Sequence, residues 1–145
     1  MSVILILMKP FERIEHTADA GIRVYGKTVE ELFENGAKGM TEIMAQGVGH
    51  GIPILRHIVI PSMDLEGLFL KWLREILFLF ARDKFLFHKI RTFSITDREL
   101  TSEIEGEILD AKRHELGLEI KAVTYHQFSL VETDRGYEAQ VIFDV

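Results

Sequence analysis

The segment that decides the fold is DLEGLFLKWLREILFLFAR, residues 64–82. Its apolar residues recur three or four positions apart, which is the spacing of one face of an α-helix. Additional leucine and phenylalanine residues widen this face, so we expect the helix to be the most buried element of the chain. The predicted helix begins after Ser62 or Asp64 and ends near Arg82. Charged residues interrupt the apolar run, which argues against a membrane span.

A second helix is predicted upstream, where Thr28 is followed three residues later by Glu31. This spacing is typical of a capping box, in which the two side chains satisfy free backbone amides at the start of a helix. Gly47 is the expected stop. Gly36 and Gly39 lie inside this helix, where each costs up to about 1 kcal/mol relative to alanine. Glycine would be favoured at these two positions if a neighbouring helix or strand approaches the backbone closely. The predicted apolar face consists of Val29, Leu32, Phe33, Ala37, Met40, Ile43 and Met44.

The rest of the chain is rich in short segments of β-branched and aromatic residues. Asp134-Arg135-Gly136 has the composition of a hairpin turn between two of them. The predicted strands are residues 11–15, 22–26, 54–60, 87–96, 100–109, 118–126, 128–133 and 137–145.

The order of these elements predicts an α+β fold. With 145 residues, the chain has the length of one domain. Because strands arrive in runs and the two helices lie close in sequence, we expect a single-domain two-layer sandwich. In it, an antiparallel or mixed β-sheet carries two main helices on one face. Residues 8–145 form this domain, and residues 1–7 are either an edge strand or an extension before a start at Met8.

Composition excludes several classes of function. There is no cysteine, which excludes disulfides, thiolate metal sites and a cysteine nucleophile and fits a cytoplasmic setting. The formal net charge is −6 without a basic run, so any involvement with RNA is expected to be indirect. The apolar run Val3–Met8 is too short to span a bilayer and lacks a basic leader and a cleavage site.

Two acidic positions could share one ion. Asp19 lies in a small-residue loop that begins at His16, where it is either a ligand or an ordinary turn residue. Asp144 precedes Val145 directly after a predicted strand, so the side chain and the terminal carboxylate would lie together. Calcium takes about 6–8 oxygen ligands, which carboxylates supply. The alternative is a solvated chain end.

Two further groups of residues mix acids, bases and histidines. The turn from Asp110 to Glu115 is either a charged loop or a docking loop with Arg113 and His114 as donors to a phosphate. A zinc hydrolase is an alternative suggested by His126 together with His16 and His114, but the sequence has no His-Glu-x-x-His motif. A Gly-x-Ser-x-Gly elbow and a phosphate-binding glycine loop are also absent, so a nucleotide-binding enzyme is unsupported.

Six segments in order resemble the archease family. The resemblance covers nearly all of the chain after Met8, and the 121–126 segment, KAVTYH, is the most specific. The six segments are His16–Asp19, Gly26–Glu31, Asp64–Phe80, Gly106–Glu115, Glu119–His126 and Asp144-Val145.

The resemblance implies an accessory protein, not an enzyme. Archeases promote guanylylation and multiple turnover of the RtcB-type tRNA-splicing RNA ligase, which uses GTP and manganese. The family's calcium-type metal site falls on Asp19, Asp144 and Val145. Further candidates for the site or the ligase contact are His16, Asp110, Arg113, His114, Lys121 and His126.

Two rival functions stay open at this point. The first is a metal-dependent hydrolase that uses His16, Asp19, His126 and Asp144. The second is a structural or chaperone-like module without a metal. Two observations would distinguish these two functions from the accessory role: which ion the purified protein retains, and whether the protein stimulates a partner ligase.

Overall fold

The structure, a computed structural model, describes residues 9–15 and 19–145. The expectations for residues 1–7 therefore lie outside the described residues. The elements are β1 (Phe11–Glu15), β2 (Asp19–Gly26), α2 (Val29–Met44), β3 (Ala45–Gln46), β4 (Ile54–Pro61), α3 (Leu65–Asp83), β5 (Phe85–Ile95), β6 (Glu99–Ile108), β7 (Glu115–Leu116), β8 (Ala122–Thr133) and β9 (Gly136–Asp144).

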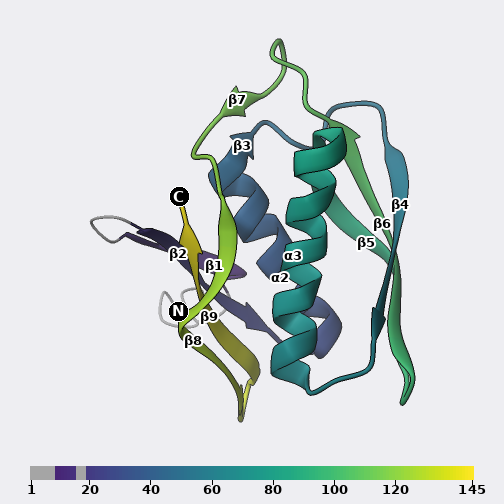
Figure 1. Ribbon diagram of the computed structural model, residues 1–145, viewed down its shortest axis with the longest axis vertical. Coiled ribbons are helices and arrows are strands. Elements are labelled where there is room, and N and C mark those ends of the chain that lie inside the picture. The colour runs from purple at the N-terminus through teal and green to yellow at the C-terminus, as the bar shows by residue number, and fades with distance from the viewer. Residues whose placement is uncertain (1–8, 16–18) are drawn as a thin grey trace.

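Two sheets flank the pair of helices (Figure 1). Among the described residues, the four-stranded sheet has the order β1-β2-β9-β8, the three-stranded sheet the order β4-β6-β5, and β3 pairs with β7. Helix α2 contacts β2 and β5, whereas α3 contacts β8, β4 and β5. The α+β class with two main helices is confirmed.

The strands divide among separate sheets, although the sequence suggested a single one. All the strand pairs within residues 9–15 and 19–145 are antiparallel. The alternation of apolar residues predicts that a segment is a strand and which side of it is buried, but it carries no information about the partner. Here β2, near the start of the chain, pairs with the last strand, β9, and the strands β4, β5 and β6 on either side of α3 form their own sheet.

The predicted helix starts are confirmed in detail. Thr28 accepts a hydrogen bond from the Glu31 N–H at 3.1 Å, and the Glu31 carboxylate accepts from the Lys27 N–H at 3.1 Å. Asp64 caps α3 by accepting from the Gly67 N–H at 2.9 Å. The starts of both helices are therefore fixed by local sequence.

The glycines inside α2 mark close contacts, as the sequence suggested. A Cβ at Gly36 would lie 2.8 Å from the Phe69 ring of α3, and a Cβ at Gly39 would lie 3.0 Å from the Phe11 ring of β1. The Trp72 indole also donates to the Phe33 carbonyl at 2.9 Å. The helices thus meet closely enough for side chains of one to reach the backbone of the other.

The C-terminal third differs from the prediction between residues 117 and 128. The predicted strands 118–126 and 128–133 form a single strand, β8, that starts at Ala122 and has a register break between Thr124 and Ser129. Gln127 has a φ of 51° inside this break. The predicted hairpin turn at residues 134–136 is confirmed, because Thr133 pairs with Gly136 and leaves Asp134 and Arg135 between the strands.

Residues 117–121, which the sequence analysis assigned partly to a strand, are not a strand, and residues 117–118 instead cap the end of α2. The Gly117 and Leu118 N–H groups donate to the Met44 and Ile43 carbonyls at 2.8 and 2.9 Å. These bonds satisfy carbonyls at the end of α2, which have no partners within the helix.

Neither helix within the described part of the chain has the length and apolar character needed to cross a membrane.

Gly36→Ala should destabilise the protein although alanine favours helices. The added methyl group collides with the Phe69 ring, which is wedged edge-on against Phe33 with 5.2 Å between the centroids. We expect a loss of about 1–3 kcal/mol in the free energy of unfolding, measured by urea denaturation. In the double variant Gly36→Ala/Phe69→Leu, the total loss of stability should be smaller than the sum of the losses in the two single variants, because leucine at position 69 removes the collision. Strict additivity would contradict this explanation.

Candidate functional site

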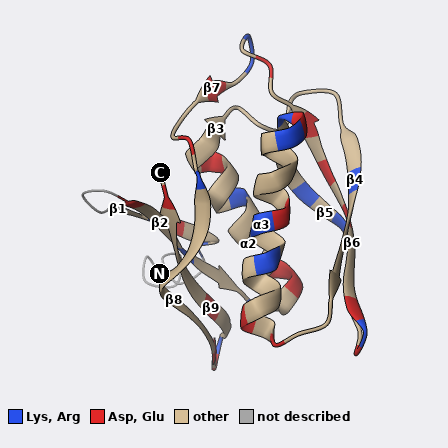
Figure 2. Ribbon diagram, viewed as in Figure 1, with Lys and Arg blue, Asp and Glu red and all other residues tan. Residues whose placement is uncertain are grey.

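Asp19 and Asp144 face each other across two neighbouring strands. They are direct partners in the antiparallel register of β2 and β9. Side chains in such pairs lie on one side of the sheet with Cβ atoms about 4.5–5.5 Å apart. Figure 2 shows acidic residues where the end of β9 meets the start of β2. Tertiary structure thus brings together two candidate ligands that are 125 positions apart in sequence (144 minus 19).

The register of this pair is set by the core. Ala20 and Ile22 pair with Phe143 and Val141, and all four side chains are buried. A shift of one residue would turn these apolar side chains outward, so the register is strongly specified. Because side chains alternate along a strand, Asp19 and Asp144 project from the opposite side of the sheet.

The last residues are held in place on two sides. The Lys121 N–H donates to the Asp144 carbonyl at 2.7 Å, and Ala122 at the start of β8 pairs with Asp144. The Val145 side chain packs against the hydrophobic core. These contacts hold the backbone of Asp144 and the Val145 side chain in place. Lys121, a further candidate, lies on the segment that flanks the pair.

The other acidic and basic candidates do not all join this pair. His16 lies outside the described residues. Among the residues that the structure describes, no three His, Asp or Glu side chains converge as a metal-binding group. His126 is exposed in the irregular part of β8. It lies four residues from Ala122, roughly 13 Å along an extended strand. Among the described residues, His126, Asp19 and Asp144 therefore do not form one metal-binding group.

His114 is not the exposed donor that the sequence suggested. Its side chain is fully buried, and its Nδ1 accepts from the Asp110 N–H at 2.8 Å. Nε2 therefore carries the hydrogen and donates to the Glu107 carboxylate at 2.6 Å. Both ring nitrogens are engaged, so neither a metal nor a phosphate can use them. Arg113 stays at the surface, 3.4 Å from the Asp110 carboxylate.

Glu107 is a structural centre that the sequence analysis did not single out. It is buried on β6 and also accepts from the Gly49 N–H at 2.8 Å. Burial works to raise the pKa of Glu107, but hydrogen bonds from Gly49, His114 and Gly51 hold it below the usual value. Nothing in the sequence distinguishes Glu107 from Glu103 and Glu105 on the same strand. Its burial depends on the two loops that fold over it.

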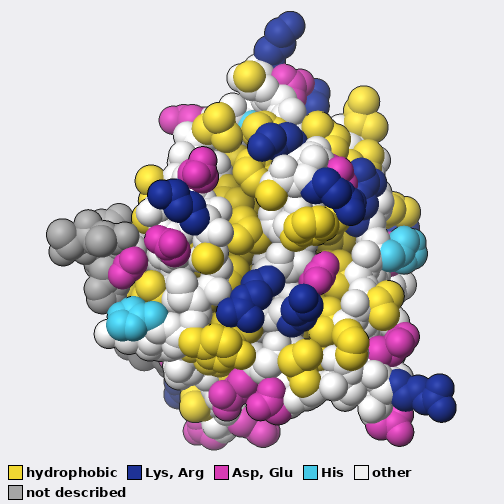
Figure 3. Space-filling view, in the orientation of Figure 1, with side chains coloured by type: hydrophobic (Ala, Val, Ile, Leu, Met, Phe, Trp, Pro, Cys, Tyr) yellow, Lys and Arg dark blue, Asp and Glu magenta, His cyan; other side chains and the backbone are white. Residues whose placement is uncertain are grey.

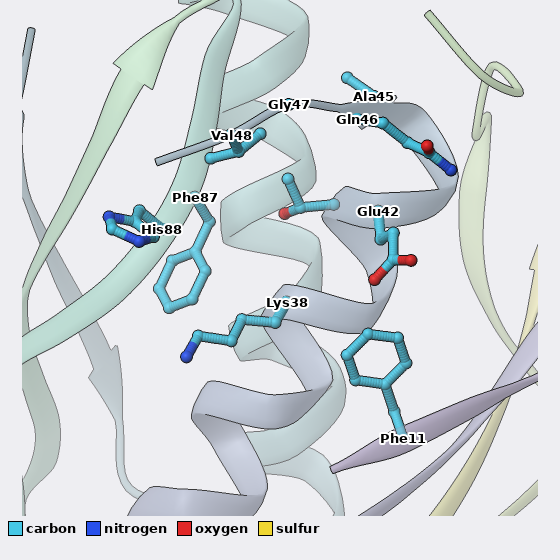
Figure 4. Close-up of a pocket in the computed structure, with 10 residues that line it drawn as sticks. Phe11, Lys38, Glu42, Ala45, Gln46, Gly47, Val48, Phe87 and His88 are labelled. Atoms are coloured by element: carbon cyan, nitrogen blue, oxygen red, sulfur yellow. The ribbon is translucent and has the colours of Figure 1, made fainter. Parts of the chain in front are cut away.

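A groove of about 390 Å³ lies over the outer side of α2 (Figure 4). Phe11 and Phe87 flank it, and Lys38 and Glu42, four residues apart on α2, both line it. The Lys38 ammonium lies 3.9 Å from the Glu34 carboxylate on the same helix. A second hollow, about 1060 Å³, lies between the start of α2 and the β8–β9 hairpin. Neither contains the acidic pair.

These features define a class: an α+β protein whose two sheets enclose two helices and whose last strand ends with a carboxylate opposite a second one at the start of β2. The family model described as the archease protein family matches residues 11–145. The chain belongs to this family.

Individual relatives agree with this assignment. The chain is 38% identical to the protein archease of Methanosarcina barkeri over 141 residues, which cover 94% of this chain and 97% of the relative. It is 38% identical to that of Saccharolobus islandicus over 140 residues, covering 95% and 100%.

Two solved structures have the same fold. The solution structure of protein 1598 from Methanobacterium thermoautotrophicum superposes with a TM-score of 0.76 at 34% identity, covering 95% of this chain and 100% of that one. The crystal structure of an archease from Thermotoga maritima, described as a possible chaperone, gives a TM-score of 0.65 at 24% identity, covering 92% and 96%.

Glu107→Gln should reduce stability in a pH-dependent way. A lowered pKa in the folded state stabilises the protein above the unfolded pKa of about 4.3, and this contribution is lost as pH falls through the folded pKa. We expect a loss of about 1–3 kcal/mol at pH 7 that shrinks below about pH 4, measured by urea denaturation. Glu103→Gln, on the same strand but partly exposed beside His57, is the control and should change stability by less than about 1 kcal/mol. A loss for Glu107→Gln that stays constant from pH 7 to pH 3 would refute the coupling.

Proposed function

We propose that this protein activates an RtcB-type tRNA-splicing RNA ligase by means of a metal ion held at the acidic end of β2 and β9. The opposition of Asp19 and Asp144 is the observation that carries the proposal. Family membership supplies the partner. GTP and manganese belong to the ligase, and the protein itself has no catalytic role.

The acidic pair calls for a cation on electrostatic grounds. Like charges directly opposite each other destabilise a sheet. A metal ion between them converts this repulsion into attraction. With the main-chain carboxylate of Val145, the two aspartates offer up to about six oxygen atoms, the lower limit of a calcium coordination sphere. The proposed ligands are therefore Asp19, Asp144 and Val145, and calcium is the proposed ion.

The same end suits a contact with the partner's active site. It is a strand end that is held by neighbouring backbone on both sides, which limits the entropy lost on binding. In the proposed mechanism, the acidic end enters the metal-containing site of the ligase and helps the metal or the nucleotide settle productively.

Direct binding of tRNA is not part of the proposal. Lys and Arg side chains do gather over α3 on the face in Figure 3. However, Lys71 is 3.4 Å from Glu75, and Arg82 is 2.7 Å from Asp83. With these cations paired and a net charge of −6, phosphate contacts would be few. The tRNA is reached only through the ligase.

Asp19→Asn should weaken calcium binding by at least about tenfold, because a neutral amide is a poorer ligand for a hard cation. Calorimetric titration of calcium into the protein measures this effect. Asp134→Asn, in the β8–β9 hairpin, changes charge equally at a distance from the site and should bind like the original. A peptide tag after Val145 should also weaken binding, since it replaces a carboxylate by a neutral amide. Unchanged affinity in Asp19→Asn would remove this residue from the site.

Asp144→Ala should abolish activation of the ligase without unfolding the protein. The side chain is exposed and contributes little to the core. The assay compares RNA product formed with limiting ligase, GTP and manganese, for the original protein, Asp144→Ala and no added protein. Asp134→Ala is the control and should stimulate fully. If the original protein yields no more product than ligase alone, the proposed function is wrong.

A further inference from the structure

Two leucines are held at the surface by their own backbone. The side chains of Leu116 and Leu118 are 65% and 45% exposed. Leu116 pairs with Ala45 in the β3–β7 ladder, and the Leu118 N–H donates to the Ile43 carbonyl at 2.9 Å. The backbone therefore cannot rotate to bury these side chains without releasing the end of α2.

Gly117, between the two leucines, brings this segment into close contact with the end of α2. The Gly117 N–H donates to the Met44 carbonyl at 2.8 Å. A Cβ at Gly117 would collide with the Ile43 carbonyl, so only glycine allows this approach. The segment is thus ordered before any partner arrives, and ordering it would cost little on binding.

The loops beside this segment are held by buried hydrogen bonds. Glu107 and His114 hold the 47–53 loop and the 110–114 turn together through the bonds to Gly49 and Asp110. Ile52, on the first of these loops, is among the most exposed large apolar side chains of the described residues. Figure 3 shows hydrophobic side chains at the surface in this part of the molecule, around β7. Rigid loops that expose apolar side chains are typical of protein interaction sites.

This surface continues into the acidic end. From Leu118 the chain reaches Lys121, whose N–H bonds to the Asp144 carbonyl, within at most about 11 Å. Figure 1 shows the segment descending from β7 beside the C-terminus. A partner that covers about 800 Å² around the acidic end, as a standard interface does, would also cover this segment.

We propose that Leu116 and Leu118 dock into an apolar recess on the ligase, as the affinity-setting part of the same interface whose acidic end acts at the active site. This inference rests on the proposed function. The leucines supply apolar burial and hold the partner, whereas Asp144 acts on the metal-containing site. The two roles predict different kinetic defects.

The experiment measures ligase binding and ligase stimulation separately. Direct calorimetric titration of the ligase gives the Kd, and product formed at increasing concentrations of this protein gives the maximal stimulation. Leu116→Gln/Leu118→Gln should raise the Kd by about tenfold or more and leave maximal stimulation unchanged. Val59→Gln changes a side chain that is 60% exposed on β4 and should alter neither quantity. Thermal unfolding checks that each variant is folded.

Each other outcome overturns the inference in a distinct way. An unchanged Kd in the double leucine variant, with stimulation by the original protein intact, rejects the leucine surface and leaves the proposed function standing. Absence of both binding and stimulation by the original protein rejects both. If light scattering shows a dimer that the double variant converts to a monomer while the ligase Kd stays the same, the leucines join two copies of this chain instead.

Discussion

The pairing of β2 with β9 is the constraint on which the candidate site depends. These strands come from opposite ends of the sequence, and their register runs from Asp19–Asp144 to Gly26–Tyr137. Buried side chains such as Ile22 and Val141 fix that register because a slip would expose them. The acidic pair is a consequence of core packing, since the same alternation that buries one face places both aspartates together on the other.

A second constraint joins the end of α2 to the proposed interface. Helix ends leave carbonyl groups without partners, and here the segment around Gly117 supplies the missing N–H groups. The same hydrogen bonds that complete the helix hold Leu116 and Leu118 at the surface. Stability and recognition therefore share one set of backbone contacts, and the segment is rigid although little of it is regular secondary structure.

The buried polar groups of the molecule serve the fold in a comparable way. Glu107 and His114 satisfy each other and two loop amides, which offsets the cost of burying a carboxylate. This explains why a histidine that resembles a catalytic or phosphate-binding residue in the sequence is unavailable to a ligand. By contrast, Asp144 and the two leucines are exposed and Asp19 is half-buried, and the backbone around all four is held by pairing or hydrogen bonds.

The sequence by itself determined the α+β class, both helices with the cap at Thr28 and a second start at Ser62 or Asp64, the β8–β9 hairpin, and the close contacts at Gly36 and Gly39. These features depend on neighbours within a few residues, or on a periodicity that is visible in the chain. Tertiary structure alone decided the division of the strands into separate sheets, the use of residues 117–118 as a helix cap, and the burial of Glu107 with His114. It also placed Asp19 opposite Asp144. Each depends on which distant segment lies alongside, and local alternation and propensity carry no record of that choice.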